Sequence, residues 1–141
     1  MKISTRGRYA IRVLADMAEH ASGEYIPLKD IAKRQDISQK YLEGIMLLLS
    51  KSGIVDGVHG KGGGYKLNRA PEDVTIGEIL RVTEGSLAPV ACLDGKTVCP
   101  RAGACKTLGM WREFYDMIND FFDKRTLKDL MKNVDGGEYV I

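Results

Sequence analysis

The chain has 141 residues, of which 44% are hydrophobic and 28% are charged, and its formal net charge is +2. This length fits one domain, or one domain with a dimerisation arm, and the apolar content is sufficient for a core. No stretch approaches the roughly 20 apolar residues that span a bilayer, and the first residues lack the apolar run of a signal peptide. We therefore expect a cytoplasmic protein with no membrane partner.

Positive charge gathers in the first half of the chain. Residues 1–70 carry 12 Lys and Arg against 7 Asp and Glu, whereas residues 71–141 carry 9 against 12. Such an asymmetry suits either an ordinary solvated surface or an anionic partner, and charge alone does not separate the two.

The basic half has the pattern of three helices. Apolar residues at helical spacing predict a first helix over 4–21, which Ser4 or Thr5 can cap. Pro27 opens a second, short helix that runs to about residue 35. Ser38 is a good N-cap for a third helix through residue 52. The turn between the last two contains Asp36, which tolerates a left-handed backbone, so the pair is typical of a helix-turn-helix.

A β-hairpin is predicted directly after these helices. Residues 54–59 form a strand-like run, residues 60–64 are Gly-Lys-Gly-Gly-Gly, and residues 65–67 form a second strand. A hairpin in this position is the wing of a winged-helix domain. The glycine run could also suggest a phosphate-binding loop, but the pattern G-x-x-x-x-G-K-[ST] is absent and the glycines precede a strand.

The second half predicts a fourth helix over 75–83, a long helix over 106–125 and a short helix from Thr126. The long helix carries an apolar stripe with alternating spacings of three and four residues. Such a surface either folds back on its own domain or pairs with a second copy, and a small winged helix has little spare surface to cover it. We therefore expect the stripe to be a dimer seam, made of Leu108, Trp111, Tyr115, Ile118 and Phe122.

These patterns predict a mainly α fold, a winged helix-turn-helix of three helices plus a β-hairpin wing, with a long C-terminal dimerisation helix. The expected divisions are a DNA-binding domain over 1–83, a cysteine-containing loop over 84–105, and the dimerisation helix with a short final helix over 106–141.

Three cysteines, Cys92, Cys99 and Cys105, are the only ones in the chain and have the spacing C-x6-C-x5-C. They lie among Gly, Asp, Lys and Pro rather than in an apolar run. Clustered thiols in a reducing compartment are more often metal ligands than disulfides, and three thiolates suit a soft metal or an iron–sulfur cluster. A structural zinc site, for which four protein ligands are usual, and a metal-free thiol sensor stay open.

The sequence does not have the residue groups of an enzyme. It lacks a Ser/His/Asp or Cys/His grouping and a Cys-x-x-Cys pair, and its two histidines, His20 and His59, are far from the cysteines in sequence. A non-regulatory alternative is an iron–sulfur carrier or scaffold, which would not need a wing or a recognition helix.

Several motifs resemble those of the bacterial winged-helix transcription regulators of the IscR/NsrR/CymR family. They are Met1-Lys-Ile-Ser-Thr-Arg-Gly-Arg-Tyr-Ala, Ile37-Ser-x-x-Tyr-Leu-Glu43, Gly60-x-Gly-Gly-Gly-Tyr65 and Thr75-Ile-Gly-Glu-Ile-Leu. The resemblance covers essentially the whole chain. It implies a homodimer on a roughly palindromic double-stranded DNA operator, with the third helix in the major groove and the wing in the minor groove.

The resemblance also implies a cofactor. IscR-like and NsrR-like members hold an iron–sulfur cluster with three loop cysteines, here Cys92, Cys99 and Cys105, and 2Fe-2S is expected, with 4Fe-4S the other choice. The implied function is a cluster-sensing regulator, expected to be a repressor, of cluster biogenesis or of a redox or nitric-oxide response. CymR-like members lack the triad and repress sulfur metabolism through a partner enzyme, which is the alternative reading.

This sequence departs from the family pattern at the fourth cluster ligand. Six residues rather than five separate the first two cysteines, and the position of the family's ligating histidine is Leu108. Where some NsrR-like proteins carry an acidic ligand, this chain has Arg8. The fourth ligand is therefore open: an acidic residue such as Asp94, a residue of the partner chain, or a small molecule.

Candidate DNA contacts fall in three segments. At the start of the third helix, Gln39 can pair with adenine, Lys40 with guanine or phosphate, and Glu43 can accept from cytosine or exclude other sequences. Each also has a plain structural reading as an exposed, capping or packing residue. The full set is Lys2, Ser4, Arg6 and Arg8 near the N-terminus, Ser38, Gln39, Lys40, Tyr41 and Glu43 in the third helix, and His59, Gly60 and Lys61 at the wing.

Overall fold

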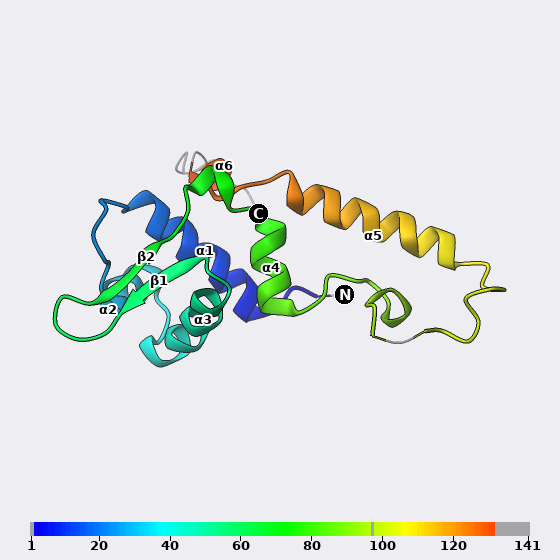
Figure 1. Ribbon diagram of the computed structural model, residues 1–141, viewed down its shortest axis with the longest axis horizontal. Coiled ribbons are helices and arrows are strands. Elements are labelled where there is room, and N and C mark those ends of the chain that lie inside the picture. Colours follow the sequence, from blue (N-terminus) through cyan, green and yellow to red (C-terminus); the bar gives the residue numbers. More distant parts are fainter. Residues whose placement is uncertain (1, 97, 132–141) are drawn as a thin grey trace.

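The computed structural model of the protein describes residues 2–96 and 98–131. Figure 1 shows a body of short helices and one hairpin, from which a long helix, α5, extends to one side. The chain leaves the body at the end of α4, runs out as a loop, and returns along α5. None of the described helices combines the length and apolarity needed to cross a bilayer.

The body begins with α1 (Thr5–Glu19), α2 (Leu28–Gln35) and α3 (Gln39–Lys51). Ser4 caps α1 and Ser38 caps α3, each accepting a hydrogen bond from the backbone N–H three residues on. Between α2 and α3, Asp36 has φ 54° and ψ 51°, the left-handed conformation expected for this turn. The helix-turn-helix prediction is therefore confirmed, with helix ends within two residues of the expected ones.

The wing consists of β1 (Val55–Val58) and β2 (Gly64–Leu67), paired antiparallel with Val55 opposite Leu67. Ile26 extends this hairpin, because its N–H and C=O both bond to the backbone of Tyr65, at 2.8 and 2.9 Å. Gly64 is required at this junction: its φ is 152°, and a Cβ there would collide with the carbonyl of Ile26. The wing is thus fixed to the segment that leads into α2.

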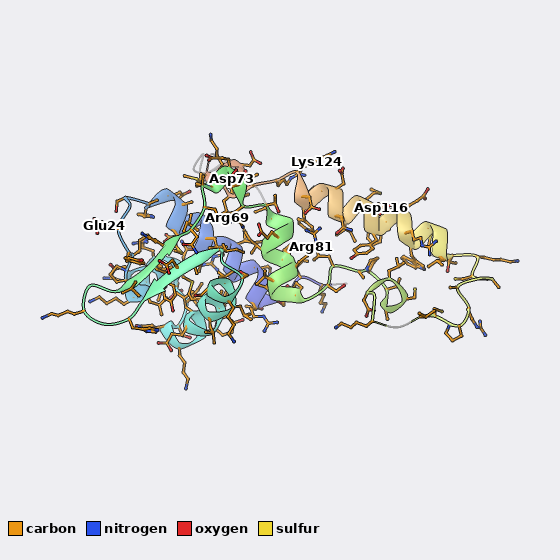
Figure 2. The ribbon with its side chains drawn as sticks, viewed as in Figure 1. Glu24, Arg69, Asp73, Arg81, Asp116 and Lys124 are labelled. Carbon is orange, nitrogen blue, oxygen red and sulfur yellow. The ribbon has the colours of Figure 1, made fainter. Side chains whose placement is uncertain are left out.

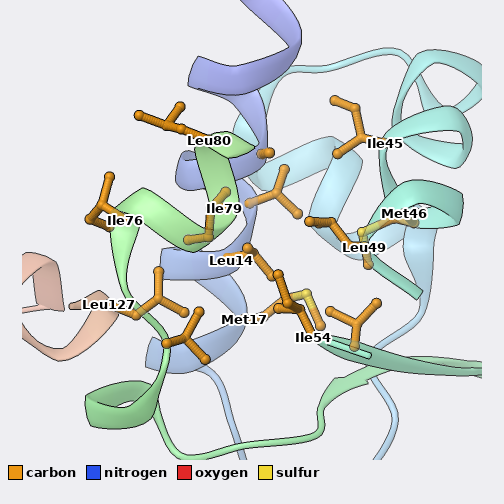
Figure 3. Close-up of a cluster of buried hydrophobic side chains, with 14 of the residues drawn as sticks. Leu14, Met17, Ile45, Met46, Leu49, Ile54, Ile76, Ile79, Leu80 and Leu127 are labelled. Atoms are coloured by element: carbon orange, nitrogen blue, oxygen red, sulfur yellow. The ribbon is translucent and has the colours of Figure 1, made fainter. Parts of the chain in front are cut away.

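The remaining body elements close the core. The 3-10 turn η1 (Pro71–Asp73) leads to α4 (Ile76–Glu84), and α6 (Leu127–Met131) returns beside η1 and α1. Leu127 is fully buried, and its N–H donates to the carbonyl of Val74 at 3.0 Å. Figure 3 shows the resulting core, in which α1, α3 and α4 bring together large buried side chains, among them Leu14, Met17, Ile45, Leu49, Ile79 and Leu80.

The segment outside the body contains the short turn η2 (Ala91–Leu93) and α5 (Leu108–Asp123). Polar contacts hold the C-terminal part of α5 to α4. The Arg81 guanidinium, labelled in Figure 2, donates to both carboxylate oxygens of Asp123 at 2.7 and 2.9 Å and to Asn119 Oδ1 at 2.9 Å. The mainly α winged-helix fold is therefore confirmed, and α6, which follows α5, packs with the body.

Candidate nucleic-acid interface and cysteine loop

A groove of about 520 Å³ separates α3 from the wing. Gln39, Glu43 and Leu47 line it from one face of α3, because each is four residues after the last. His59 and Gly60 line it from the wing. Gln39 and Glu43 of the predicted helix residues and two of the three predicted wing residues are therefore brought to one surface, whereas Ser38 and Tyr41 line a separate hollow beside Tyr9.

The α3 residues predicted to meet DNA are all exposed. Ser38 Oγ accepts the N–H of Tyr41 at 3.1 Å, so its capping role is confirmed. The Tyr41 ring stands edge-on to Tyr9 of α1, with centroids 5.9 Å apart, which fixes its direction while leaving 42% of it exposed. The turn of the helix that carries Gln39, Lys40 and Tyr41 therefore faces solvent.

Glu43 is exposed within this groove and, in the part of the chain that the structure describes, takes part in no ion pair. A carboxylate without a cation beside it gains nothing for folding. Beside a DNA duplex it is repelled by phosphates and tolerated only where it accepts a base hydrogen bond. The placement suits a residue that selects among sequences.

The four N-terminal candidates divide into two pairs. Lys2 and Arg8 are exposed, and Arg8 makes only a local bond, to Thr5 Oγ1 at 3.1 Å. Ser4 and Arg6 instead contact α4: Ser4 Oγ donates to Glu84 Oε1 at 2.7 Å, and the Arg6 guanidinium donates to the Thr83 carbonyl at 2.7 Å. In this structure, Ser4 and Arg6 therefore have roles within the chain.

Among the groove residues that sequence reasoning missed are Lys29 and Leu47. Lys29 lies at the start of α2, two residues after Pro27. A positive charge next to the recognition helix could have marked Lys29 as a candidate phosphate contact. Leu47 is 55% exposed, although it belongs to a helix with a well-filled apolar face. Its i+4 relation to Glu43 was the signal that this face, too, is at the surface.

The cysteine loop holds its thiols apart. All three cysteines are free, with Cys92 and Cys99 partly buried and Cys105 exposed. Among the described residues, no three His, Cys, Asp or Glu side chains are grouped to hold a metal ion. The convergence expected from the sequence is therefore absent from this structure. Outside η2 the described part of the loop, residues 85–96 and 98–105, has no regular element, and Asp94 Oδ1 accepts the backbone N–H of Lys96 at 2.9 Å.

Cys105 has the surroundings of a thiolate. A hydrogen bond with Thr107 Oγ1, at 3.4 Å, and further bonds from the N–H groups of Thr107 and Leu108 lower the pKa of the Cys105 thiol. These donors belong to the start of α5, where the helix dipole also favours negative charge. The thiolate is the form that binds soft metals, so the donor chemistry of the loop fits such a group although its geometry is not closed.

The expected dimer seam is partly used inside the chain. Leu108 and Ile118 are only 8% and 6% exposed, and Tyr115 and Phe122 pack against the core, while Trp111 is partly buried. The physical reason is that α5 packs against α4 rather than standing free. The large apolar side chains that α5 leaves exposed lie on the neighbouring face and are Met110, Phe114, Met117 and Phe121.

The helix-turn-helix, the anchored wing and the exposed polar face of α3 define a winged-helix DNA-binding regulator. The chain belongs to the Rrf2 family of iron-dependent transcriptional regulators, whose model matches residues 3–133. Members of this family regulate transcription and are not enzymes, which confirms the prediction of a non-enzymatic protein.

The proteins similar to this chain include both IscR and CymR. The chain is 40% identical to the protein rrf2 of Nitratidesulfovibrio vulgaris, over 94% of this chain and 89% of that protein. It is 38% identical to the HTH-type transcriptional regulator IscR of Vibrio campbellii, over 94% of this chain and 79% of that one. The solved structure of CymR, the global cysteine regulator of B. subtilis, matches with a TM-score of 0.76 and 32% identity, over 96% of this chain and 99% of that chain. The resemblance stated from the sequence is confirmed.

Proposed function

We propose that this protein is a cytoplasmic, cluster-sensing regulator that binds a roughly palindromic DNA operator as a homodimer. In this proposal α3 enters the major groove, the wing enters the minor groove, and the cysteine loop senses iron–sulfur status, a redox signal or nitric oxide. The observation that carries the DNA half is the groove in which Gln39 and Glu43 of α3 face His59 and Gly60 of the wing.

The direct contacts follow from chemistry and position. Gln39 can pair with adenine, Lys40 with guanine or a phosphate, and Glu43 can accept from cytosine. Lys61 at the wing tip and the exposed Lys2 and Arg8 supply charge for phosphates. Lys29 at the edge of the groove joins this phosphate-contacting set.

The proposed homodimer uses the exposed face of α5. Met110, Phe114, Met117 and Phe121 are 39–68% exposed, and their spacings of four, three and four residues place them on one stripe. A contiguous apolar stripe of this length is unusual on the surface of a monomer. Two such helices that pair by a twofold axis would bury it and leave two recognition helices for two operator half-sites.

We assign Cys92, Cys99 and Cys105 as the protein ligands of the cluster, with 2Fe-2S favoured over 4Fe-4S. When bound, the cluster would supply a redox-active and labile centre whose loss reports on oxidants, nitric oxide or iron shortage. The lowered pKa of Cys105 supports this use of the loop. Leu108 cannot ligate and is buried, so the fourth ligand comes from elsewhere in the loop, from the partner chain or from a small molecule.

A second candidate function is a cysteine or sulfur-metabolism repressor that works without a cluster. The separation of the three thiols in this structure and the similarity to B. subtilis CymR favour it. The visible absorption spectrum of protein purified without oxygen separates the two. Charge-transfer bands that are absent from a Cys92→Ala/Cys99→Ala/Cys105→Ala variant support the cluster. A colourless protein that binds duplex supports the second candidate, bound zinc marks a structural site, and a coloured protein that binds no duplex marks an iron–sulfur carrier.

The DNA half is tested by two substitutions that have different signatures. Duplexes selected by the wild-type protein from a random pool serve as probes. Lys61→Ala should weaken binding to all of them and lower the salt slope by about one unit, because it removes one phosphate contact. Glu43→Ala should instead reduce the differences in binding affinity among the selected duplexes.

The matched controls are Lys128→Ala on α6 and Glu113→Ala on α5, both exposed and outside the groove. They should change neither the salt slope nor the order of preference. An unchanged preference in Glu43→Ala would remove the specificity role, and an unchanged salt slope in Lys61→Ala would remove the phosphate contact.

A further inference from the structure

The N-terminus of α1 has half of a capping box. In this motif the N-cap side chain accepts the N–H of the third helical residue, and a Glu or Gln at that third position accepts the N–H of the N-cap in return. Here Ser4 Oγ accepts the N–H of Gly7 at 3.1 Å. Gly7, at the third position, has no side chain with which to complete the motif.

The missing carboxylate comes from α4. Glu84, the last residue of that helix, accepts both the backbone N–H of Ser4 at 2.9 Å and its hydroxyl at 2.7 Å. A Cβ at Gly7 would collide with Glu84 Oε1, so the absent side chain is also the space that this carboxylate occupies. The Arg6 guanidinium adds a parallel contact, donating to the Thr83 carbonyl at 2.7 Å.

Glu84 lies at the point where α4 ends and the loop that carries the cysteines begins. The chain turns at Gly85, with φ 81°, and the segment that carries the three cysteines begins there. Figure 1 shows the N-terminal segment beside this end of α4. A cavity of about 260 Å³ lies at the junction, lined by Lys2, Ile3 and Glu84 on one side and Ser86, Leu87 and Ala88 on the other. Lys2 and Arg8, which we assign to phosphate contacts, therefore lie on either side of Ser4 in the sequence. The carboxylate that accepts from Ser4 belongs to Glu84, where the cysteine loop begins.

We propose that Glu84 is a positioning residue that completes the α1 cap from α4 and so couples the cysteine loop to the phosphate-contacting turn of α1. A shift of the α4 end moves the carboxylate away from Ser4 and leaves the first turn of α1 without one acceptor. This inference rests on the proposed DNA-binding function, but the cap itself is measurable without DNA.

The first measurement is the rate of hydrogen–deuterium exchange at the backbone amides of residues 2–12, in the protein without DNA or any other ligand. Glu84→Ala should speed exchange in the first turn of α1 by about tenfold, the factor that a lost cap contributes. Glu84→Gln keeps an acceptor oxygen and should change it by less than about threefold. Glu19→Ala, an exposed glutamate at the other end of α1, is the control and should leave these amides unchanged.

A designed rescue separates capping from general damage. Gly7→Glu alone should lower the melting temperature, because its side chain meets Glu84. Combined with Glu84→Ala it should recover slow exchange, because Ser4 and residue 7 then form a complete local capping box. Exchange in α1 that is the same in Glu84→Ala and wild type, or a double variant no slower than Glu84→Ala, would overturn the inference.

The second measurement is affinity for a selected duplex at fixed salt, where Glu84→Ala should bind about fivefold more weakly and the double variant should recover. In the double variant the cap no longer depends on α4, so the affinity difference between cluster-loaded and cluster-free protein should shrink. A difference as large as in wild type would refute the coupling. If wild type binds no duplex at all, the proposed function fails, and exchange alone decides whether Glu84 caps α1.

Discussion

The body (α1 to α4, the wing, η1 and α6) and the arm (the cysteine loop with α5) differ in how many of their apolar and polar side chains find partners within the chain. In the body, Leu14, Ile45 and Leu80 are buried to 1% exposure or less, and α1, α3 and α4 each begin with a side-chain cap. In the arm, a stripe of four large apolar side chains stays exposed and three thiols stay apart. The body is thus closed by contacts within the chain, whereas the arm leaves exposed the apolar surface that we propose to pair with a second copy.

The largest effect should come from opening the body. Leu14→Ala removes a side chain that has no exposed surface and lies among α1, α3 and α4. We expect the free energy of unfolding to fall by about 3–5 kcal/mol, from lost burial and the cavity left behind. Urea denaturation measures it, with Met117→Ala on the arm as the matched control under conditions where the protein is a monomer. Equal losses for the two would contradict the division into body and arm.

The next effect concerns the arm and should leave the body folded. Met117, 68% exposed, lies in the middle of the proposed dimer face. Met117→Glu puts a charge into that face, so the dimer dissociation constant should rise by about 100-fold in sedimentation equilibrium. Arg112→Glu should not change it, because Arg112 is exposed and lies four residues before Asp116 (Figure 2), on the polar side of α5. A wild type that is already a monomer at micromolar concentration would refute the dimer.

A smaller effect should follow from the ion pair that joins α1 to α2. Burial tends to raise the pKa of Asp16, but hydrogen bonds from Arg34, at 2.7 Å, and from Gln35, together with the charge of Arg34, outweigh it and lower that pKa below its ordinary value. The carboxylate therefore stabilises the fold above the unfolded pKa, and this contribution is lost as pH falls through the lower folded value.

Asp16→Asn should cost about 2 kcal/mol at pH 7, since one partner of a largely buried charged hydrogen bond is removed. The difference from wild type should begin to shrink as pH falls below about 4, where Asp16 of the unfolded chain takes up its proton, and should disappear only below the lowered pKa of the folded state. Urea denaturation at pH 7 and pH 3 measures both values. A difference that stays constant between these two pH values would show that the Asp16 charge is not its source.

The smallest effect concerns the thiol at the start of α5. Thr107→Val removes the hydroxyl that contacts Cys105, so the pKa of this thiol should rise and the thiolate fraction at pH 7 should fall. Alkylation of Cys105 by iodoacetamide, followed by mass spectrometry, should slow about two- to threefold. Thr107→Ser keeps the hydroxyl and should react like wild type. Equal rates for valine and serine would mean that this bond does not activate the thiol.

Local signals were enough to predict most of the body. Ser4 and Ser38 were recognisable as N-caps because a hydroxyl before an apolar-periodic run satisfies the first free N–H groups of a helix. The left-handed Asp36 and the glycine-rich hairpin followed from turn chemistry. The exposure of Gln39 and Glu43 also follows from spacing along α3, because burial of Leu42, Ile45 and Leu49 turns these two side chains toward solvent.

The face of α5 was not predictable in the same way. Its apolar side chains spread over a stripe wide enough for two faces, and the sequence does not say which one meets α4. The bond from Arg81 to Asp123 and Asn119 fixes the rotation of the helix. That rotation buries Ile118 and exposes Met117, although the two residues are adjacent in sequence.

The helices, the turn, the wing and the cysteine spacing were therefore readable from the sequence, because these features depend on neighbours a few residues apart. Three features required the packed fold: the apolar face of α5 that stays free, the bonds of Ser4 and Arg6 to α4, and the acceptor that Glu84 supplies to the N-cap of α1. Ser4 and Glu84 are 80 residues apart, and no local propensity or spacing encodes a contact over that distance. Packing of α1 against α4 brings the two together, since both helices bury their apolar faces in one core.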